Sequence, residues 1–167
     1  MLLLMRNNYY DSIAQGYEEL HREEQQAKLA LIKKHLSVKP TDLLLDVGCG
    51  TGITSNFDCV VVGIDPAIQL LKRAPLRLKV QGEAEHLPFK DKTFDLVVSV
   101  TAIQNFHHIE HGLREIRRVG RGEYVLTFLK KSPKREAIVA HIQQLFRVKE
   151  TIEEEKDMLL FCSHDNS

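Results

Sequence analysis

The stretch that decides the fold is Leu43-Leu44-Leu45-Asp46-Val47-Gly48-Cys49-Gly50-Thr51-Gly52. In it, an apolar run ends in a carboxylate and then in three glycines at alternate positions. A strand that leads into a glycine-rich turn is how α/β folds bring their backbone close to a nucleotide-like ligand. The stretch therefore predicts the first strand of an α/β domain with a ligand site at its carboxyl end. The alternative is a tight turn without a ligand, because one glycine-rich turn is a weak signal.

The acid before the glycines indicates which kind of ligand to expect. A carboxylate at Asp46, two residues before Gly48, would repel a pyrophosphate and attract an ammonium or a sulfonium group. The glycines follow the pattern GxGxG, and Ile53 stands where the third glycine of the dinucleotide pattern belongs. The sequence therefore predicts an adenosine ligand without phosphates, of which S-adenosylmethionine (SAM) is the obvious example.

A second acid ends the next apolar run, Val60-Val61-Val62-Gly63-Ile64-Asp65. An acid at the end of the second strand is placed to accept both ribose hydroxyls of an adenosine. Pro66 and Leu70 follow it and could line one face of the adenine. The alternative is that Asp65 caps a helix, since Pro66 suits the first helical position.

Five motifs in a fixed order extend these two signals over most of the chain. They are DVGCGTG, VVGIDPA, GEAEHLPF, TFDLVVS and a His-His pair followed by LREIRRV. The set, from about residue 9 to 161, resembles class I SAM-dependent methyltransferases. Its nearest branch is the methyltransferase type 11 group, which includes ubiquinone and menaquinone biosynthesis enzymes and some tRNA wobble-uridine enzymes.

The resemblance implies SAM as cofactor and adds residues to its site. Glu83 would accept a hydrogen bond from the adenine amino group beside the Ala84 amide, and carbonyls from Ser99 to Thr101 would face the amino end of SAM. Tyr17, in a segment that resembles the family's lid helix, could close over the methionine end; ordinary packing of the ring is the alternative. The predicted SAM-binding set is Tyr17, Asp46, Gly48, Cys49, Gly50, Gly52, Asp65, Pro66, Leu70, Glu83, Ala84, Ser99 and Thr101.

The predicted fold is α/β and Rossmann-like: a mostly parallel sheet with an antiparallel C-terminal edge strand and a shortened first crossover over residues 53–57. Residues 1–37 form an N-terminal helical lid segment and 38–167 the SAM-binding catalytic core, within one domain overall. The acidic stretch 153–157 is expected to be a solvated hairpin turn. Expected helices cover residues 8–20, 22–36, 111–119 and 132–144, and expected strands cover 42–47, 59–65, 76–81, 93–100, 124–129, 145–152 and 158–162.

The candidate catalytic residues follow the fourth strand. Gln104, His107 and His108 are the polar side chains expected nearest to the acceptor, and an imidazole titrates near neutral pH, so either histidine could take a proton. A general base is needed only if the nucleophile must lose a proton. The alternative is that the histidine pair is structural and caps the next helix.

Composition indicates the cellular location and the kinds of partner to expect. The chain of 167 residues has a formal net charge of zero, so no overall field draws it to nucleic acid or membrane. Its three cysteines are odd in number and lack metal-ligand spacing, which predicts no metal and a reduced, cytoplasmic protein. The apolar run 1–5 is too short for a signal peptide or a membrane span.

The methyl acceptor is open at this stage, and a small molecule is the first hypothesis. A basic run between Arg114 and Arg135 favours an anionic substrate, so an RNA (tRNA) methyltransferase with an activating partner is one alternative. The interleaved Glu110 and Glu115 favour instead an ordinary solvated helix face. A non-catalytic SAM-binding subunit is the other alternative. The short segment 53–57 should leave one face of the sheet thinly covered near Val61, which predicts a homodimer or a small partner subunit.

Overall fold

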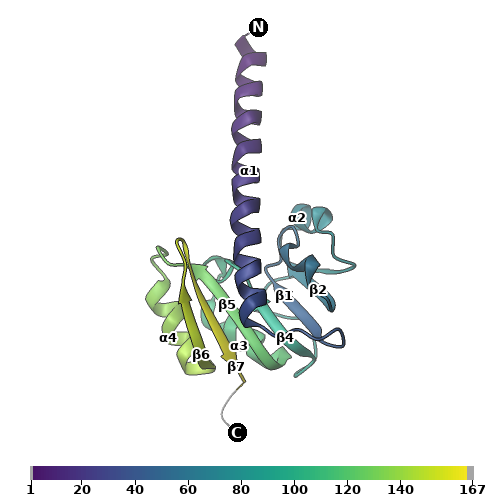
Figure 1. Ribbon diagram of the computed structural model, residues 1–167, viewed down its shortest axis with the longest axis vertical. Coiled ribbons are helices and arrows are strands. Elements are labelled where there is room, and N and C mark those ends of the chain that lie inside the picture. The colour runs from purple at the N-terminus through teal and green to yellow at the C-terminus, as the bar shows by residue number, and fades with distance from the viewer. Residues whose placement is uncertain (1, 165–167) are drawn as a thin grey trace. The chain divides into compact units, whose positions relative to one another are not determined.

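The computed structural model describes the backbone of residues 2–164 and the side chains of residues 19–164. It separates into two compact units, Met1–Ser37 and Val38–Ser167. The first unit is one continuous helix, α1 (Leu2–His35) (Figure 1). The expectation of two helices, 8–20 and 22–36, is wrong: residues 20–22 contain neither Gly nor Pro to end a helix, nor a capping residue to begin one.

The second unit is built on a sheet of seven strands in the order β3-β2-β1-β4-β5-β7-β6 (Figure 1). β1, β2, β3, β4 and β5 are parallel, whereas β7 runs antiparallel to both β5 and β6. This confirms the Rossmann-like α/β prediction with its antiparallel C-terminal edge. The strands are β1 (Leu43–Val47), β2 (Val60–Asp65), β3 (Leu78–Gln81), β4 (Phe94–Ser99), β5 (Gly120–Leu129), β6 (Arg147–Glu153) and β7 (Asp157–Ser163).

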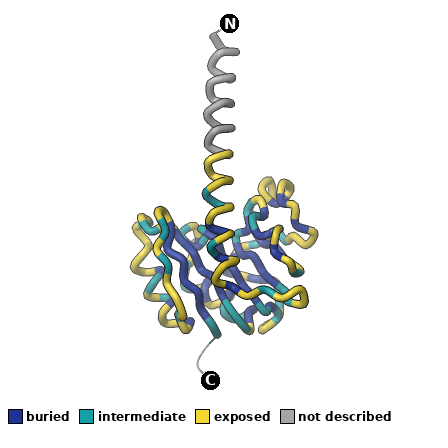
Figure 2. The backbone as a smooth tube through the Cα atoms, viewed as in Figure 1, coloured by how far each residue is buried: buried dark blue, intermediate teal, exposed yellow. Residues whose placement is uncertain are grey.

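The core lies between the central strands and two amphipathic helices, α3 (Ile109–Val119) and α4 (Arg135–Leu145). Ile116 of α3 and Ile138 of α4 are fully buried and belong to one cluster with Leu45 and Val97 of the sheet. The inner strands are buried along most of their length (Figure 2). Strands buried on both faces are rigid supports, so the loops at their carboxyl ends have well-defined starting points.

The first crossover is as short as predicted. It is a single 3-10 turn, η1 (Ile53–Asn56), whose Thr54 and the following Phe57 are buried. The expectation that Val61 stays uncovered is wrong, because Val61 is buried, and the exposed large apolar side chains of β2 and β3 are Val60 (51%) and Leu78 (49%). Leu78 lies on β3, which is the edge strand of the sheet, and Val60 lies on its neighbour β2.

Two further short elements flank the site: α2 (Ile68–Arg73), which the sequence patterns do not predict, and a second 3-10 turn, η2 (Ile103–Asn105). The acidic stretch 153–157 forms the β6–β7 hairpin connection, but Asp157 is only 1% exposed, so the expectation of a wholly solvated turn is wrong there. No helix within residues 2–164 is long and apolar enough to cross a membrane.

Candidate functional site

The glycine loop after β1 has the backbone that the sequence predicts. Gly48, Gly50 and Gly52 have φ values of 75°, 51° and 82°, in the left-handed region. A Cβ atom on Gly48 would lie 2.5 Å from that of Ala102, whereas one on Gly50 would meet nothing within 4 Å. Gly48 is therefore needed for close packing, and Gly50 borders open space that a ligand could fill. Cys49 is buried, which raises the pKa of its thiol to about 12, so its side chain stays neutral.

Asp46 lies directly beneath this loop and is 1% exposed. Its Oδ2 accepts a hydrogen bond of 2.6 Å from the Thr54 hydroxyl of η1. Its Oδ1 is buried without a hydrogen-bond partner among the described residues. Burial raises the pKa of Asp46 to about 7, against the opposing effect of the Thr54 hydrogen bond. A buried acceptor without a partner is costly, so a ligand donor that reaches Oδ1 would be bound favourably.

Asp65 at the end of β2 holds the loop from the other side. Its Oδ2 accepts the Gly50 N–H at 2.8 Å and its Oδ1 accepts the Ala67 N–H at 2.8 Å. The N-cap of α2 is Ala67, and no side chain caps this helix, so Asp65 is not the helix cap that the alternative expected. Each carboxylate oxygen has a second lone pair, so both can accept a further hydrogen bond. Pro66 and Leu70 follow it and are exposed.

The two acids of the loop after β3 have different surroundings. Glu83 is exposed and Ala84 is buried. Glu85 is buried, and its Oε1 accepts a hydrogen bond of 3.0 Å from the backbone N–H of His108. No motif in the sequence points to Glu85, although its place between Ala84 and Leu87 is a signal of burial.

The loop after β4 is fixed by side-chain hydrogen bonds. Ser99 is fully buried and donates to the Val47 carbonyl at 2.9 Å, which joins β4 to β1. Thr101 has a φ of 54° and forms hydrogen bonds with Thr127 and Asp157. Neither of these two residues is predicted from the sequence to lie near the site. Gln104 donates through Nε2 to the Thr101 carbonyl at 2.8 Å. This loop is therefore well ordered next to the glycine loop, where Ala102 meets Gly48.

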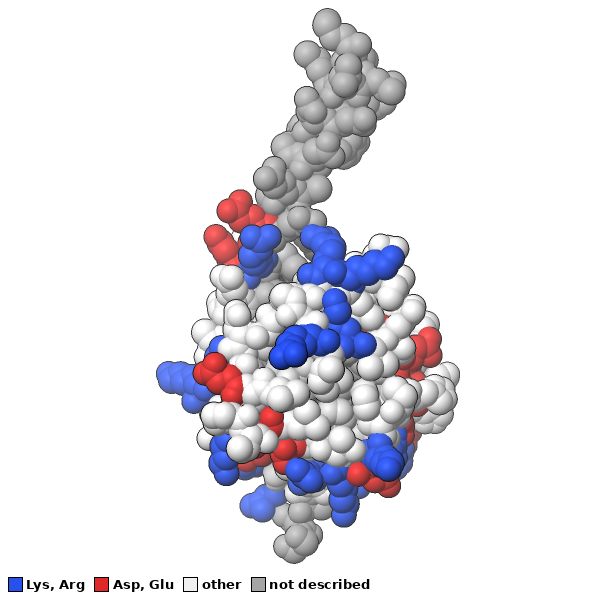
Figure 3. Space-filling view, turned by 90° about the vertical axis from the view of Figure 1, so that its right-hand side faces the viewer, with Lys and Arg blue, Asp and Glu red and all other residues white. Residues whose placement is uncertain are grey.

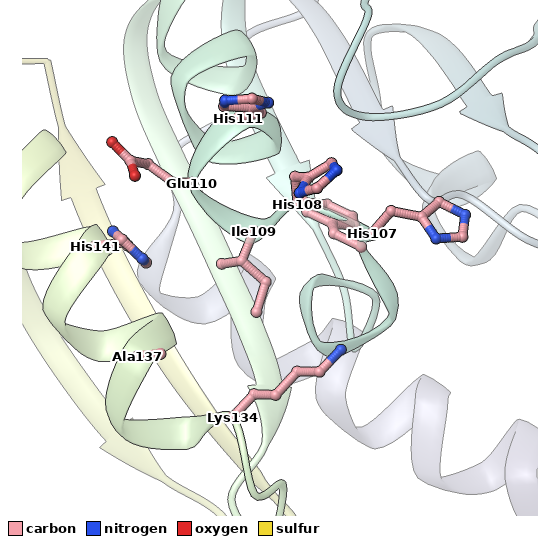
Figure 4. Close-up of a pocket in the computed structure, with 9 residues that line it drawn as sticks. His107, His108, Ile109, Glu110, His111, Lys134, Ala137 and His141 are labelled. Atoms are coloured by element: carbon pink, nitrogen blue, oxygen red, sulfur yellow. The ribbon is translucent and has the colours of Figure 1, made fainter.

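A pocket of about 310 Å³ lies between α3 and α4, the helices that follow β4 and β5 (Figure 4). The rings of His108 and His111 are 5.4 Å apart between centroids, and Lys134 donates from Nζ to the Gln104 carbonyl at 3.1 Å. His108 occupies the N-cap position of α3, but its side chain makes no capping hydrogen bond. The lining residues are Phe106, His107, His108, Ile109, Glu110, His111, Lys134, Ala137 and His141.

The structure thus brings the predicted residues from Asp46 onward to the carboxyl ends of β1, β2, β3 and β4, with His107 and His108 exposed in the pocket. Tyr17 lies outside the residues whose side chains are described. Among residues 19–164, no group of three or more His, Cys, Asp or Glu side chains is placed to hold a metal ion.

Four of the eight basic residues from Arg114 to Arg135 form ion pairs with carboxylates. Arg114 pairs with Glu110 at 2.7 Å, and Arg118 pairs with Glu115 at 2.7 Å. Arg121 and Lys130 also contact carboxylates, at 2.8 and 3.4 Å. The run is therefore closer to the solvated, paired helix face than to a continuous cationic surface.

Fold and site together define a Rossmann-like domain whose glycine loop and acidic residues lie at the carboxyl ends of its strands, where open α/β sheets bind their ligands. A family model described as a methyltransferase domain matches residues 45–128, which include the glycine loop, Asp65, Glu83 and the loop after β4. The chain belongs to this family of methyltransferase enzymes.

Two relatives illustrate the sequence similarity. Uncharacterized protein MJ1252 of Methanocaldococcus jannaschii is 32% identical over 125 residues, which cover 72% of this chain and 49% of that protein. Demethylmenaquinone methyltransferase of Corynebacterium kroppenstedtii is 36% identical over 96 residues, covering 52% of this chain and 41% of that protein. The chain spans about half the length of the curated relatives it matches.

Two solved structures illustrate the likeness in fold. A SAM-dependent methyltransferase from Aquifex aeolicus superposes with a TM-score of 0.67 at 17% identity, covering 81% of this chain and 89% of that one. A complex between the Haloferax volcanii Trm112 methyltransferase activator and a putative methyltransferase gives a TM-score of 0.70 at 17% identity, covering 92% of this chain and 96% of that one. These likenesses establish the fold.

Proposed function

We propose that the chain binds SAM at the glycine loop and transfers its methyl group to a small-molecule acceptor. The observation that carries this proposal is the buried Asp46, whose Oδ1 has no partner within the described structure, beneath a loop that leaves open space at Gly50. The residues present fit SAM because they offer acceptors for its ammonium, ribose and adenine groups. The short turn η1 after the glycine loop does not provide the long helix N-terminus that binds the pyrophosphate of a dinucleotide.

The residues divide the ligand among them. Asp46 and the glycine loop would hold the methionine end, with the backbone from Ser99 to Thr101. Asp65 would accept the ribose hydroxyls, and Glu83 with the Ala84 amide would bind the adenine edge, while Pro66 and Leu70 would cover an adenine face. When bound, SAM would supply a methyl group on a sulfonium sulfur, which a nucleophile attacks in line at carbon while the sulfur leaves as a neutral thioether. Positioning and exclusion of water can supply much of the rate.

The pocket between α3 and α4 is the proposed acceptor site. It follows the carboxyl ends of β4 and β5, where ligands bind in open α/β sheets, and its volume of about 310 Å³ suits a small molecule. His107 or His108 would accept a proton at a ring nitrogen if the acceptor is a hydroxyl or an amine. The ion pairs of the basic run favour the small molecule over RNA.

The test is transfer of label from methyl-tritiated SAM to a quinone-containing lipid extract, total tRNA and total protein. The proposal expects label in small molecules of the extract and none with Asp65→Ala. Label in tRNA alone would establish the RNA alternative. Tight SAM binding with no label in any fraction would favour the non-catalytic subunit.

We further propose that a small partner protein contacts the edge formed by β2, β3 and α2. Val60 and Leu78 are exposed there, and this side of the molecule has a broad uncharged surface with basic side chains toward its upper and lower parts and acidic side chains at its flanks (Figure 3). The Trm112 activator complex among the similar folds supports a protein partner rather than a second copy of the chain. Light scattering of the purified chain would show a monomer if this is right and a dimer if self-association covers the edge. Val60→Asp should abolish capture of the partner without changing SAM affinity.

A further inference from the structure

The loop between β4 and η2 contains a backbone conformation that its residue does not favour. Thr101 has a φ of 54°, in the left-handed region, although threonine is β-branched. In such residues a positive φ is rare and persists only where the surroundings impose it. The imposing groups should therefore be visible as hydrogen bonds to Thr101.

Two strands supply those hydrogen bonds. The Thr101 N–H donates to Oγ1 of Thr127 at 2.7 Å, and the Thr101 hydroxyl donates to Oδ2 of Asp157 at 2.5 Å. Thr127 is fully buried in β5, and Asp157, the first residue of β7, is 1% exposed. In the β5–β7 register Asp157 lies opposite Leu129, so Thr127 is its diagonal neighbour on the same face, 3.5 Å away between Oγ1 and Oδ2.

The conformation of Thr101 is passed on to the rest of the loop. Its backbone carbonyl accepts a hydrogen bond of 2.8 Å from Nε2 of Gln104, and the backbone carbonyl of Gln104 accepts one of 3.1 Å from Nζ of Lys134. A chain of hydrogen bonds therefore links β7, the loop after β4 and the start of α4. Its last member, Lys134, lines the pocket that contains His107, and Ala102, next to Thr101, packs against Gly48 of the glycine loop.

A buried carboxylate is costly to the fold unless it is well bonded, and charge-assisted bonds from hydroxyl groups are among the stronger ones that it can accept. The bond between Asp157 and the Thr101 hydroxyl can therefore hold Thr101 in a backbone conformation that threonine does not favour.

We propose that Asp157 is a positioning residue for the SAM site. By accepting the Thr101 hydroxyl, it holds Thr101 in the left-handed conformation and so directs the backbone from Ser99 to Thr101, with Gln104, toward the ligand. Asp157 does not contact the ligand and acts only through Thr101. The proposal rests on the proposed function, because it assigns this loop to the SAM site.

The test compares Asp157→Asn, Thr127→Val, Thr101→Gly and the double variant Asp157→Asn/Thr101→Gly in the full chain. Glu153→Gln, an exposed acid on β6 of the same hairpin, is the matched control. SAM affinity is measured by calorimetry, and hydrogen exchange of residues 98–106 is measured without ligand. Asp157→Asn and Thr127→Val should each weaken SAM binding about ten-fold, which is the effect of losing one charge-assisted or buried hydrogen bond. Both variants should also speed hydrogen exchange of residues 98–106. The control Glu153→Gln should change neither quantity.

Glycine adopts a positive φ without help, so it supplies the decisive comparison. In the Thr101→Gly background, Asp157→Asn should change SAM affinity less than two-fold. A merely structural Asp157 would cost the same in both backgrounds, and that result would overturn the inference, as would unchanged affinity and exchange in the single variant. If the wild-type chain fails to bind SAM, the proposed function falls, while the exchange pattern still decides whether Asp157 fixes the loop.

Discussion

The Thr54 hydroxyl donates a hydrogen bond of 2.6 Å to Oδ2 of Asp46, eight residues earlier in the chain. The shortened crossover therefore folds back beneath the glycine loop and supplies a polar contact to the acid that precedes it. A single 3-10 turn is enough for this purpose, because the site needs one donor there rather than the anion-binding end of a long helix.

Removing that donor should destabilise the fold. Thr54→Val leaves both oxygens of Asp46 buried without a partner, so the free energy of unfolding should fall by about 1–3 kcal/mol. Thr54→Ser keeps the hydroxyl and serves as the control. Urea denaturation at pH 8, where Asp46 is ionised, measures both; equal stability of the two variants would contradict the assigned role of the hydroxyl.

The raised pKa of Asp46 predicts a specific pH dependence of stability. Because its pKa is about 7 in the folded chain and near 3.8 when unfolded, the folded state holds a proton between these values that the unfolded state has lost. Stability should therefore fall as pH rises from about 4 to 7 and level off above, by up to about 4 kcal/mol from this group. The difference between wild type and Asp46→Asn isolates this effect, and a difference that does not vary with pH would refute it.

The same pKa predicts proton release when SAM binds. A cationic ligand favours the ionised carboxylate, so SAM affinity should rise between pH 6 and pH 8. Calorimetry at pH 6.5 in two buffers of different ionisation enthalpy should detect about half a proton or more released per SAM bound. Asp46→Asn should release none, and wild-type release equal to that of the variant would mean that the ligand does not act on Asp46.

The fold follows from local patterns. The apolar run and glycines of residues 43–52 define a strand and a loop within ten residues, and Pro133 marks the turn before α4. Asp157 could not be placed in the same way: its contact with Thr101 spans 56 residues and depends on the antiparallel register of β5 and β7. The acidic residues before Asp157 predict a solvated turn, and the one opposing signal in the sequence is that Asp157 directly precedes the apolar run Met158–Cys162.

Asp65 should be the most sensitive acid for ligand affinity. Two charge-assisted hydrogen bonds to the ribose are worth about 1.5–3 kcal/mol each, so their loss in Asp65→Ala should weaken SAM binding by roughly a hundred-fold to ten-thousand-fold. Asp58→Ala, an exposed acid just before β2, is the control and should bind normally. A folded Asp65→Ala chain with wild-type affinity would reduce Asp65 to a structural support for the Gly50 and Ala67 amides.

Glu83 and Glu85 should separate ligand binding from stability. Glu83→Gln should weaken SAM binding less than Asp65→Ala does, because an amide oxygen still accepts a hydrogen bond, and should reduce discrimination against an inosine analogue of SAM. Glu85→Gln weakens the bond to the His108 N–H, so it should lower the melting temperature by a few degrees, with a small effect on affinity. The reverse pattern would mean that the adenine is read by Glu85.

The ligand preference of the glycine-loop site is measured directly by a calorimetric titration of the purified chain with SAM, its demethylated product, NAD and ATP at pH 8. A site built on Asp46, Asp65 and the GxGxG loop should bind SAM and the product with micromolar dissociation constants, and NAD and ATP at least a hundred-fold more weakly. NAD binding as tight as that of SAM would contradict this assignment, because the buried carboxylate of Asp46 beneath the glycine loop should repel the pyrophosphate of NAD.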